Sequence, residues 1–142
     1  MALDEREGEA GIRATLNLGH TFGHAVETGL GYGAWLHGEA VSLGMVMAAD
    51  MSVRLGWIDK GVYDRTVALL RRAKLPVALP KGSGMTYDKF AETMSIDKKV
   101  SDGVLHLILL KGALGTCVFT AEYDPAKLRE TIDVFCQEGY EP

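Results

Sequence analysis

The sequence has little of several features that mark particular classes of protein. Its 142 residues contain only two cysteines, Cys117 and Cys136. We therefore expect no secreted disulfide framework, and we interpret both as reduced thiols in a cytoplasmic protein. The formal net charge of −4 leaves no basic patch that would bind nucleic acid. No apolar run approaches the roughly 18 residues of a membrane span, and the acidic first ten residues carry no secretory segment.

The remaining composition is that of a globular domain. Apolar residues make up 47% of the chain and charged residues 24%, which argues against disorder. The length suits one domain or a piece of a larger protein. Hydrophobic periodicity, caps and turn residues predict a mainly α fold with a small β-hairpin near the C-terminal third. The expected helices cover residues 13–28, 38–55, 62–73, 86–94 and 125–139, and the expected strands cover 104–110 and 116–120.

Two segments of this prediction bear on function. Residues 38–55 are apolar around most of the helical wheel, which predicts a buried central helix whose methionines fill the core. Residues 95–103 are polar and contain Lys98 and Lys99, so we expect a solvated turn there. A lysine pair beside a glycine loop could also bind a phosphate or a carboxylate.

Three of the four histidines lie close together in the sequence, at positions 20, 24 and 37. His20 and His24 are four residues apart, so on a helix they share one face, and Glu27 continues that face. His37 follows a glycine-rich break that a single helix would not cross. Two helices meeting at a corner could therefore direct His20 and His37 at one metal ion, with Asn17 and Glu27 as hydrogen-bonding neighbours. The alternative is that these histidines are ordinary core residues.

Several separated motifs carry a resemblance to a known family. In order they are Glu9-x-Gly11-x-Arg13-x-x-Leu16-Asn17-x-Gly19-His20-Thr21-x-Gly23-His24-Ala25-x-Glu27, then Leu36-His37-Gly38-Glu39-Ala40-Val41, then Asp97-Lys98-Lys99 with Gly103 and a leucine-rich strand. This pattern resembles 3-dehydroquinate synthase, a member of the sugar-phosphate cyclases. The resemblance covers nearly the whole chain.

The resemblance implies a fold and an activity. The family converts 3-deoxy-arabino-heptulosonate 7-phosphate to 3-dehydroquinate and phosphate in the shikimate pathway, using NAD and a divalent metal, zinc or cobalt. An N-terminal domain binds NAD, and a helical C-terminal domain carries most of the substrate site. Residues 1–142 are similar to that helical C-terminal domain alone. The resemblance also implies a homodimer when the enzyme is complete, and an isolated chain that is inactive.

The resemblance also implies roles for individual residues. His20 and His37 match the metal ligands, and His24, Lys99 and Glu9 match catalytic positions. Arg13, Asn17 and Lys98 match substrate-binding positions, with the choice between Lys98 and Lys99 left open. His24 could relay a proton or bind the leaving phosphate.

The sequence lacks two parts of the family pattern and differs from it at one residue. The family's third metal ligand is a glutamate of the N-terminal domain, which this chain does not include, and the glycine-rich NAD-binding segment is also absent. His106 stands where many relatives have arginine, so the resemblance implies no contact there. Because His106 lies in a strand pattern, we expect it to be structural.

Two other functions fit the same residues. One is another sugar-phosphate cyclase or a metal-dependent polyol dehydrogenase. The other is a non-catalytic helical module that keeps its histidines as core residues or as a metal-binding scaffold.

Overall fold

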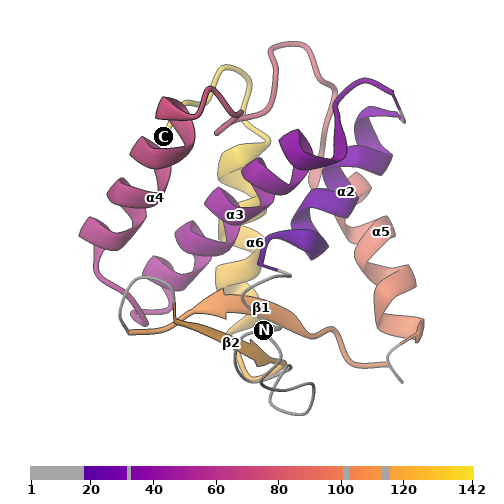
Figure 1. The fold of residues 1–142 in the computed structure, drawn as a ribbon. Helices are drawn as coiled ribbons and strands as arrows, with labels where there is room; N and C mark the ends of the chain where they lie inside the picture. The colour runs from indigo at the N-terminus through magenta and orange to yellow at the C-terminus, as the bar shows by residue number, and fades with distance from the viewer. Residues whose placement is uncertain (1–17, 32, 101–102, 113–115) are drawn as a thin grey trace, which may run out of the picture.

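The structure is a computed structural model that describes residues 18–31, 33–100, 103–112 and 116–142. These residues form five α-helices and one two-stranded sheet (Figure 1). In chain order the elements are α2 (His20–Leu30), α3 (His37–Arg54), α4 (Lys60–Arg72), α5 (Tyr87–Val100), β1 (Leu107–Leu110), β2 (Cys117–Thr120) and α6 (Pro125–Phe135). The mainly helical fold with a hairpin near its C-terminal third is confirmed.

Helix α3 forms the centre of the molecule, as its apolar sequence predicts. It packs against α2, α4, α6 and β1 (Figure 1). Its side chains from Leu43 to Met51 are largely inaccessible to solvent, and Met47 and Met51 are fully buried in the core. A helix covered on this many sides must be apolar around most of its circumference. None of the described helices is both long and apolar enough to cross a membrane.

Glycines bring the backbones of α2 and α3 into direct contact. A Cβ atom built on Gly44 would collide with the backbone oxygen of Gly19 and lie 2.8 Å from the backbone nitrogen of Gly23. A Cβ on Gly23 would lie 3.1 Å from the backbone oxygen of Ala40. The missing side chains therefore let the first turn of α2 lie against α3.

Helix α2 begins later than the sequence predicts. The predicted helix starts at Arg13, but Leu18 and Gly19 form a turn and α2 begins at His20. Gly19 has a φ of +86°, a left-handed conformation that a right-handed helix cannot contain. Residues 13–17 lie outside the described part of the chain.

Helix α5 ends later than predicted, and this places the candidate residues Lys98 and Lys99 on a helix. The sequence predicts a helix ending at Met94 and a turn over 95–103, whereas α5 continues to Val100 and carries Asp97, Lys98 and Lys99. No glycine or proline interrupts 87–100, and lysines in the last turn interact favourably with the helix dipole. After α5, Gly103 has a φ of +83° and its N–H donates to the Lys98 carbonyl at 2.8 Å.

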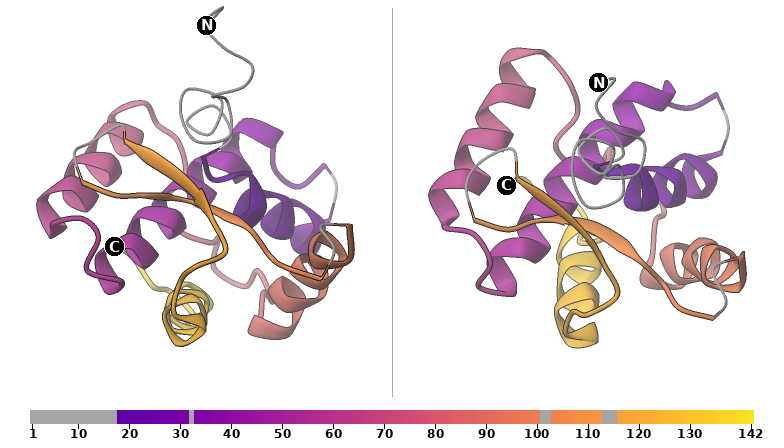
Figure 2. Two further views of the ribbon diagram at one scale, coloured as in Figure 1. Left: turned by 90° about the horizontal axis from the view of Figure 1, so that it is seen from below. Right: turned by 60° about the horizontal axis from the view of Figure 1, so that its bottom comes forward.

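The hairpin lies across the lower side of the helices in Figure 1, and Figure 2 shows it extending from the α4 side toward α5. The strands are antiparallel, with Leu107 opposite Thr120 and Leu110 opposite Cys117. Strand β1 starts three residues later than the predicted start at Val104. The N–H of Leu110 donates to Ser52 Oγ of α3 at 3.0 Å, which fixes the hairpin on the central helix.

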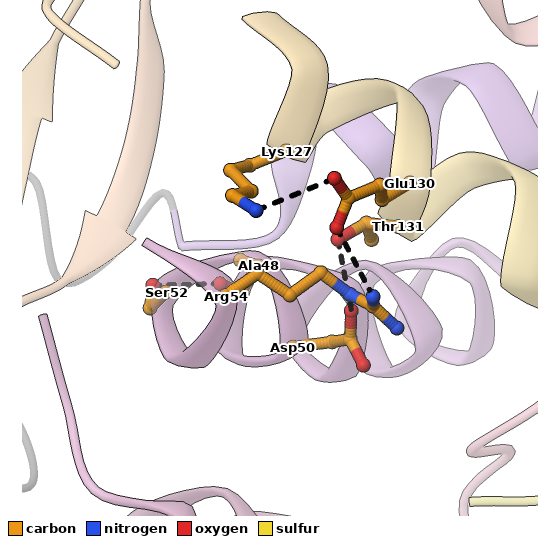
Figure 3. Close-up of polar contacts among 7 residues, drawn as sticks. All are labelled: Ala48, Asp50, Ser52, Arg54, Lys127, Glu130 and Thr131. Atoms are coloured by element: carbon orange, nitrogen blue, oxygen red, sulfur yellow. Dashed lines mark hydrogen bonds and ion pairs between the residues drawn. The ribbon is translucent and has the colours of Figure 1, made fainter. Parts of the chain in front are cut away.

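A partly buried polar cluster joins α3 to α6 (Figure 3). The carboxylate of Asp50 accepts hydrogen bonds from Arg54 Nε at 2.6 Å and from Thr131 Oγ1 at 2.8 Å. Arg54 also contacts Glu130 at 3.5 Å. Asp124 caps α6 by accepting from the Ala126 N–H at 2.9 Å, with Pro125 as the first helical residue, as predicted.

Candidate metal and substrate site

His20 and His37 each stand at the first position of a helix, and the structure brings them together. Their ring centres are 5.5 Å apart and their planes are inclined by 52°. The glycine contacts hold the start of α2 against Val41 and Met45 of α3. A tetrahedral zinc with Zn–N bonds of about 2.0–2.1 Å would hold two imidazole centres about 5 Å apart. The observed separation therefore fits two ligands of one cation.

The start of α3 is fixed by a side-chain cap. The carboxylate of Glu39 accepts a hydrogen bond from the Leu36 N–H at 2.8 Å, which satisfies a backbone donor at the helix N-terminus. Because His37 directly follows Leu36, this cap also sets where the imidazole leaves the backbone.

The polar surroundings of the two histidines differ. His37 Nδ1 lies 3.1 Å from Glu27 Oε1, and because a carboxylate can only accept, this ring nitrogen is the donor. The Nδ1 atom of His20 is buried and has no hydrogen-bond partner among the described residues. A buried polar atom without a partner costs free energy. We therefore expect a ligand or another segment to supply the missing partner of His20 Nδ1.

The described residues do not form a complete metal site. Within residues 18–31, 33–100, 103–112 and 116–142, no three histidine, cysteine, aspartate or glutamate side chains are arranged to hold an ion. Zinc in a catalytic site usually has three protein ligands. Two imidazoles fit as part of such a set, and the remaining ligand would have to come from outside these residues.

His24 lies one turn after His20 and approaches α5. Its Nδ1 atom is 3.9 Å from Asp97 Oδ1, a distance at which a protonated imidazole and a carboxylate attract. Sequence reasoning missed Asp97 because it placed this residue in a turn. The only feature of the sequence that pointed to Asp97 was its position directly before Lys98 and Lys99.

The two lysines lie on the last turn of α5. Lys98 lines a cavity of about 470 Å³ between α5, the segment before β1, and α6, and no residue of α2 or α3 lines this cavity. Lys98 therefore lines a cavity that is separate from the site of His20 and His37.

The other candidate residues fall into two groups. Glu9, Arg13 and Asn17 lie outside the described residues. His106 directly precedes β1 and stacks on Phe119, with ring centres 4.8 Å apart and planes inclined by 5°. This packing fits the structural role expected for His106.

Comparison with known protein families identifies the chain. Residues 1–100 match the family model described as "3-dehydroquinate synthase C-terminal". The chain belongs to this family. The match includes the histidine pair and the lysines of α5, so the resemblance found in the sequence is confirmed.

Curated relatives give the same result. The chain is 59% identical over 133 residues to the chloroplastic 3-dehydroquinate synthase of Solanum lycopersicum, covering 94% of this chain and 30% of that protein. It is 55% identical over 137 residues to the 3-dehydroquinate synthase of Pseudomonas aeruginosa, covering 96% of this chain and 35% of that protein. The chain thus spans about a third of the length of these relatives.

A solved structure shares the fold. The 2-epi-5-epi-valiolone synthase ValA from Streptomyces hygroscopicus subsp. jinggangensis 5008, with NAD+ and Zn2+ bound, superposes with a TM-score of 0.70 at 26% identity. The match covers 82% of this chain and 31% of ValA.

Proposed function

We propose that this chain is the C-terminal, metal- and substrate-binding part of a 3-dehydroquinate synthase, which converts 3-deoxy-arabino-heptulosonate 7-phosphate to 3-dehydroquinate and phosphate. One observation supports this most strongly: two imidazoles with centres 5.5 Å apart, in a chain 59% identical to a relative with that name. The N-terminal domain of the same enzyme would bind NAD and supply the third metal ligand, a glutamate.

His20 and His37 would hold the divalent metal, zinc or cobalt. When bound, the metal polarises a substrate hydroxyl and the carbonyl that replaces it, which eases hydride exchange with NAD. Support for this cofactor pair includes the similar fold of ValA, whose structure holds NAD+ and Zn2+.

The other proposed residues would bind and orient the sugar phosphate. Arg13, Asn17 and Lys99 would hold its phosphate and carboxylate, with Glu9 at a further catalytic position. Lys99 is preferred over Lys98 because Lys98 lines a cavity that α2 and α3 do not reach.

His24 would hold or transfer a proton near the leaving phosphate. Asp97 lies 3.9 Å from its ring, so a carboxylate of α5 stands beside this imidazole.

The proposed compartment is reducing. Cys136 is a thiol, and burial, with the nearby charge of Asp133, raises its pKa to about 11, which keeps it protonated and unreactive. The cytoplasm is the proposed location, although relatives from plants are named chloroplastic. We also propose a homodimer for the complete enzyme.

A second candidate is another sugar-phosphate cyclase, because ValA shares the fold. Identity favours the synthase, at 59% to the Solanum enzyme against 26% to ValA. A polyol dehydrogenase and a non-catalytic module remain further alternatives.

Turnover of substrate by the complete enzyme tests the proposal. We expect one phosphate and one dehydroquinate per heptulosonate phosphate consumed, with no net NADH, because the synthase returns its hydride. A dehydrogenase would instead accumulate NADH in proportion to substrate. Phosphate release only from a different sugar phosphate would identify another cyclase, and no turnover with any of these substrates would support the non-catalytic module.

A further inference from the structure

We propose that Glu27 is a positioning residue for the metal site: its carboxylate fixes the tautomer and orientation of His37, so that the Nε2 lone pair is presented to the cation. This inference rests on the proposed function, because it assumes that His37 is a metal ligand. In this role Glu27 does not coordinate the metal itself but acts through His37.

The contact between Glu27 and His37 is short and crosses two helices. Glu27 Oε1 of α2 lies 3.1 Å from His37 Nδ1 of α3. The Glu27 side chain is 18% exposed, whereas the His37 side chain is 63% exposed. In the described part of the chain, Glu27 forms no ion pair with a lysine or arginine. The largely buried Glu27 carboxylate therefore has the His37 imidazole as its side-chain partner.

This contact decides which nitrogen of His37 can bind a metal. A neutral imidazole carries hydrogen on one nitrogen and a lone pair on the other. Since Nδ1 donates to Glu27, the lone pair is on Nε2. A carboxylate on the non-ligating nitrogen also makes the ligating nitrogen more basic and stops the ring from rotating. Rotation matters here because so exposed a ring has little packing to hold it.

The same helix supplies both the other metal histidine and this carboxylate. His20 begins α2 and Glu27 lies two turns later, so the two face α3 together. The buried His20 Nδ1 has no such acceptor among the described residues. Loss of Glu27 should therefore affect the metal through His37 alone.

Zinc affinity of the complete, metal-depleted enzyme tests the inference. We would measure it at one pH by competition with a chromogenic chelator, for the wild type, Glu27→Gln, Glu27→Ala and His37→Ala. Glu92→Gln is the matched control, because Glu92 is an exposed glutamate of α5. We expect about 10-fold weaker zinc binding for Glu27→Gln, which keeps an acceptor without the charge, and up to about 100-fold weaker binding for Glu27→Ala. Glu92→Gln should bind as the wild type does.

The outcomes separate this inference from the proposed function. If His37→Ala binds zinc normally, the proposed metal pair is wrong and the inference is wrong with it. If His37→Ala loses zinc while both Glu27 variants bind normally, only the inference is wrong. Loss of zinc by Glu27→Gln as complete as in His37→Ala would make Glu27 a ligand and overturn its positioning role. A lower melting temperature with unchanged zinc affinity would show a structural role only, which also contradicts the inference.

Discussion

Gly44 is the single position on which the contact between α2 and α3 depends most strongly. We expect Gly44→Ala to destabilise the complete enzyme by about 1–3 kcal/mol, because the new Cβ would collide with backbone atoms of Gly19 and Gly23 that cannot move as side chains do. The free energy of unfolding in urea measures this. Zinc affinity should fall too, since the start of α2, which carries His20, would be pushed away from α3.

Gly61→Ala is the control for Gly44. Gly61 lies in α4, and a Cβ there would meet nothing within 4 Å. This change should be neutral or stabilise by up to about 1 kcal/mol, because alanine favours the helix. Equal stability of the two variants would contradict the described packing.

His24 should matter for rate and not for metal content. We expect His24→Ala in the complete enzyme to keep its zinc and to lower kcat by about 10²–10⁴, the usual effect of losing a proton-transferring group. His106→Gln is the control, because His106 stacks on Phe119 at the hairpin, and it should leave kcat within about twofold. Loss of zinc from His24→Ala, or an unchanged kcat, would contradict the assigned role.

At the scale of elements, the attachment of α6 to α3 depends on a buried hydrogen bond. Thr131→Val should lower the free energy of unfolding by about 1–3 kcal/mol, because it removes the donor 2.8 Å from the Asp50 carboxylate (Figure 3). Thr66→Val is the control: Thr66 Oγ1 only donates to the Val62 carbonyl within α4, at 2.9 Å. It should change stability by less than about 0.5 kcal/mol. Comparable losses in both variants would show that the cluster adds no specific stability.

Element positions could be predicted where one local signal was strong. The all-round apolar sequence of α3 and the Asp124-Pro125 start of α6 were sufficient. The end of α5 was mispredicted because polarity at 95–100 was interpreted as a turn, although no residue there breaks a helix. The start of α2 was mispredicted because Gly19 was interpreted as a weak helical residue, whereas it has a left-handed φ.

In the candidate site, too, only the features with a local sequence signal could be predicted. The spacing of His20 and His37 across a glycine break predicted that two helices could bring their rings together. The approach of Asp97 to His24 could not be predicted, because it depends on how α5 packs against α2 and no local pattern encodes that packing.

At the scale of the whole molecule, we expect the 142-residue chain to be inactive by itself. The described residues offer no complete set of metal ligands, and the chain covers 35% of the Pseudomonas relative. Phosphate release from the heptulosonate phosphate should be absent for the chain alone and present for the complete enzyme, assayed at equal concentration with NAD and zinc. Turnover by the chain alone would contradict the requirement for a second domain.

The most direct test of the account is the location of zinc in a crystal of the complete enzyme, measured by anomalous diffraction at the zinc edge. We expect one peak between α2 and α3, about 2.0–2.1 Å from one ring nitrogen of His20 and from Nε2 of His37. A zinc peak that touches only one of these rings, or that lies away from both, would contradict the claim that the two helices share one cation.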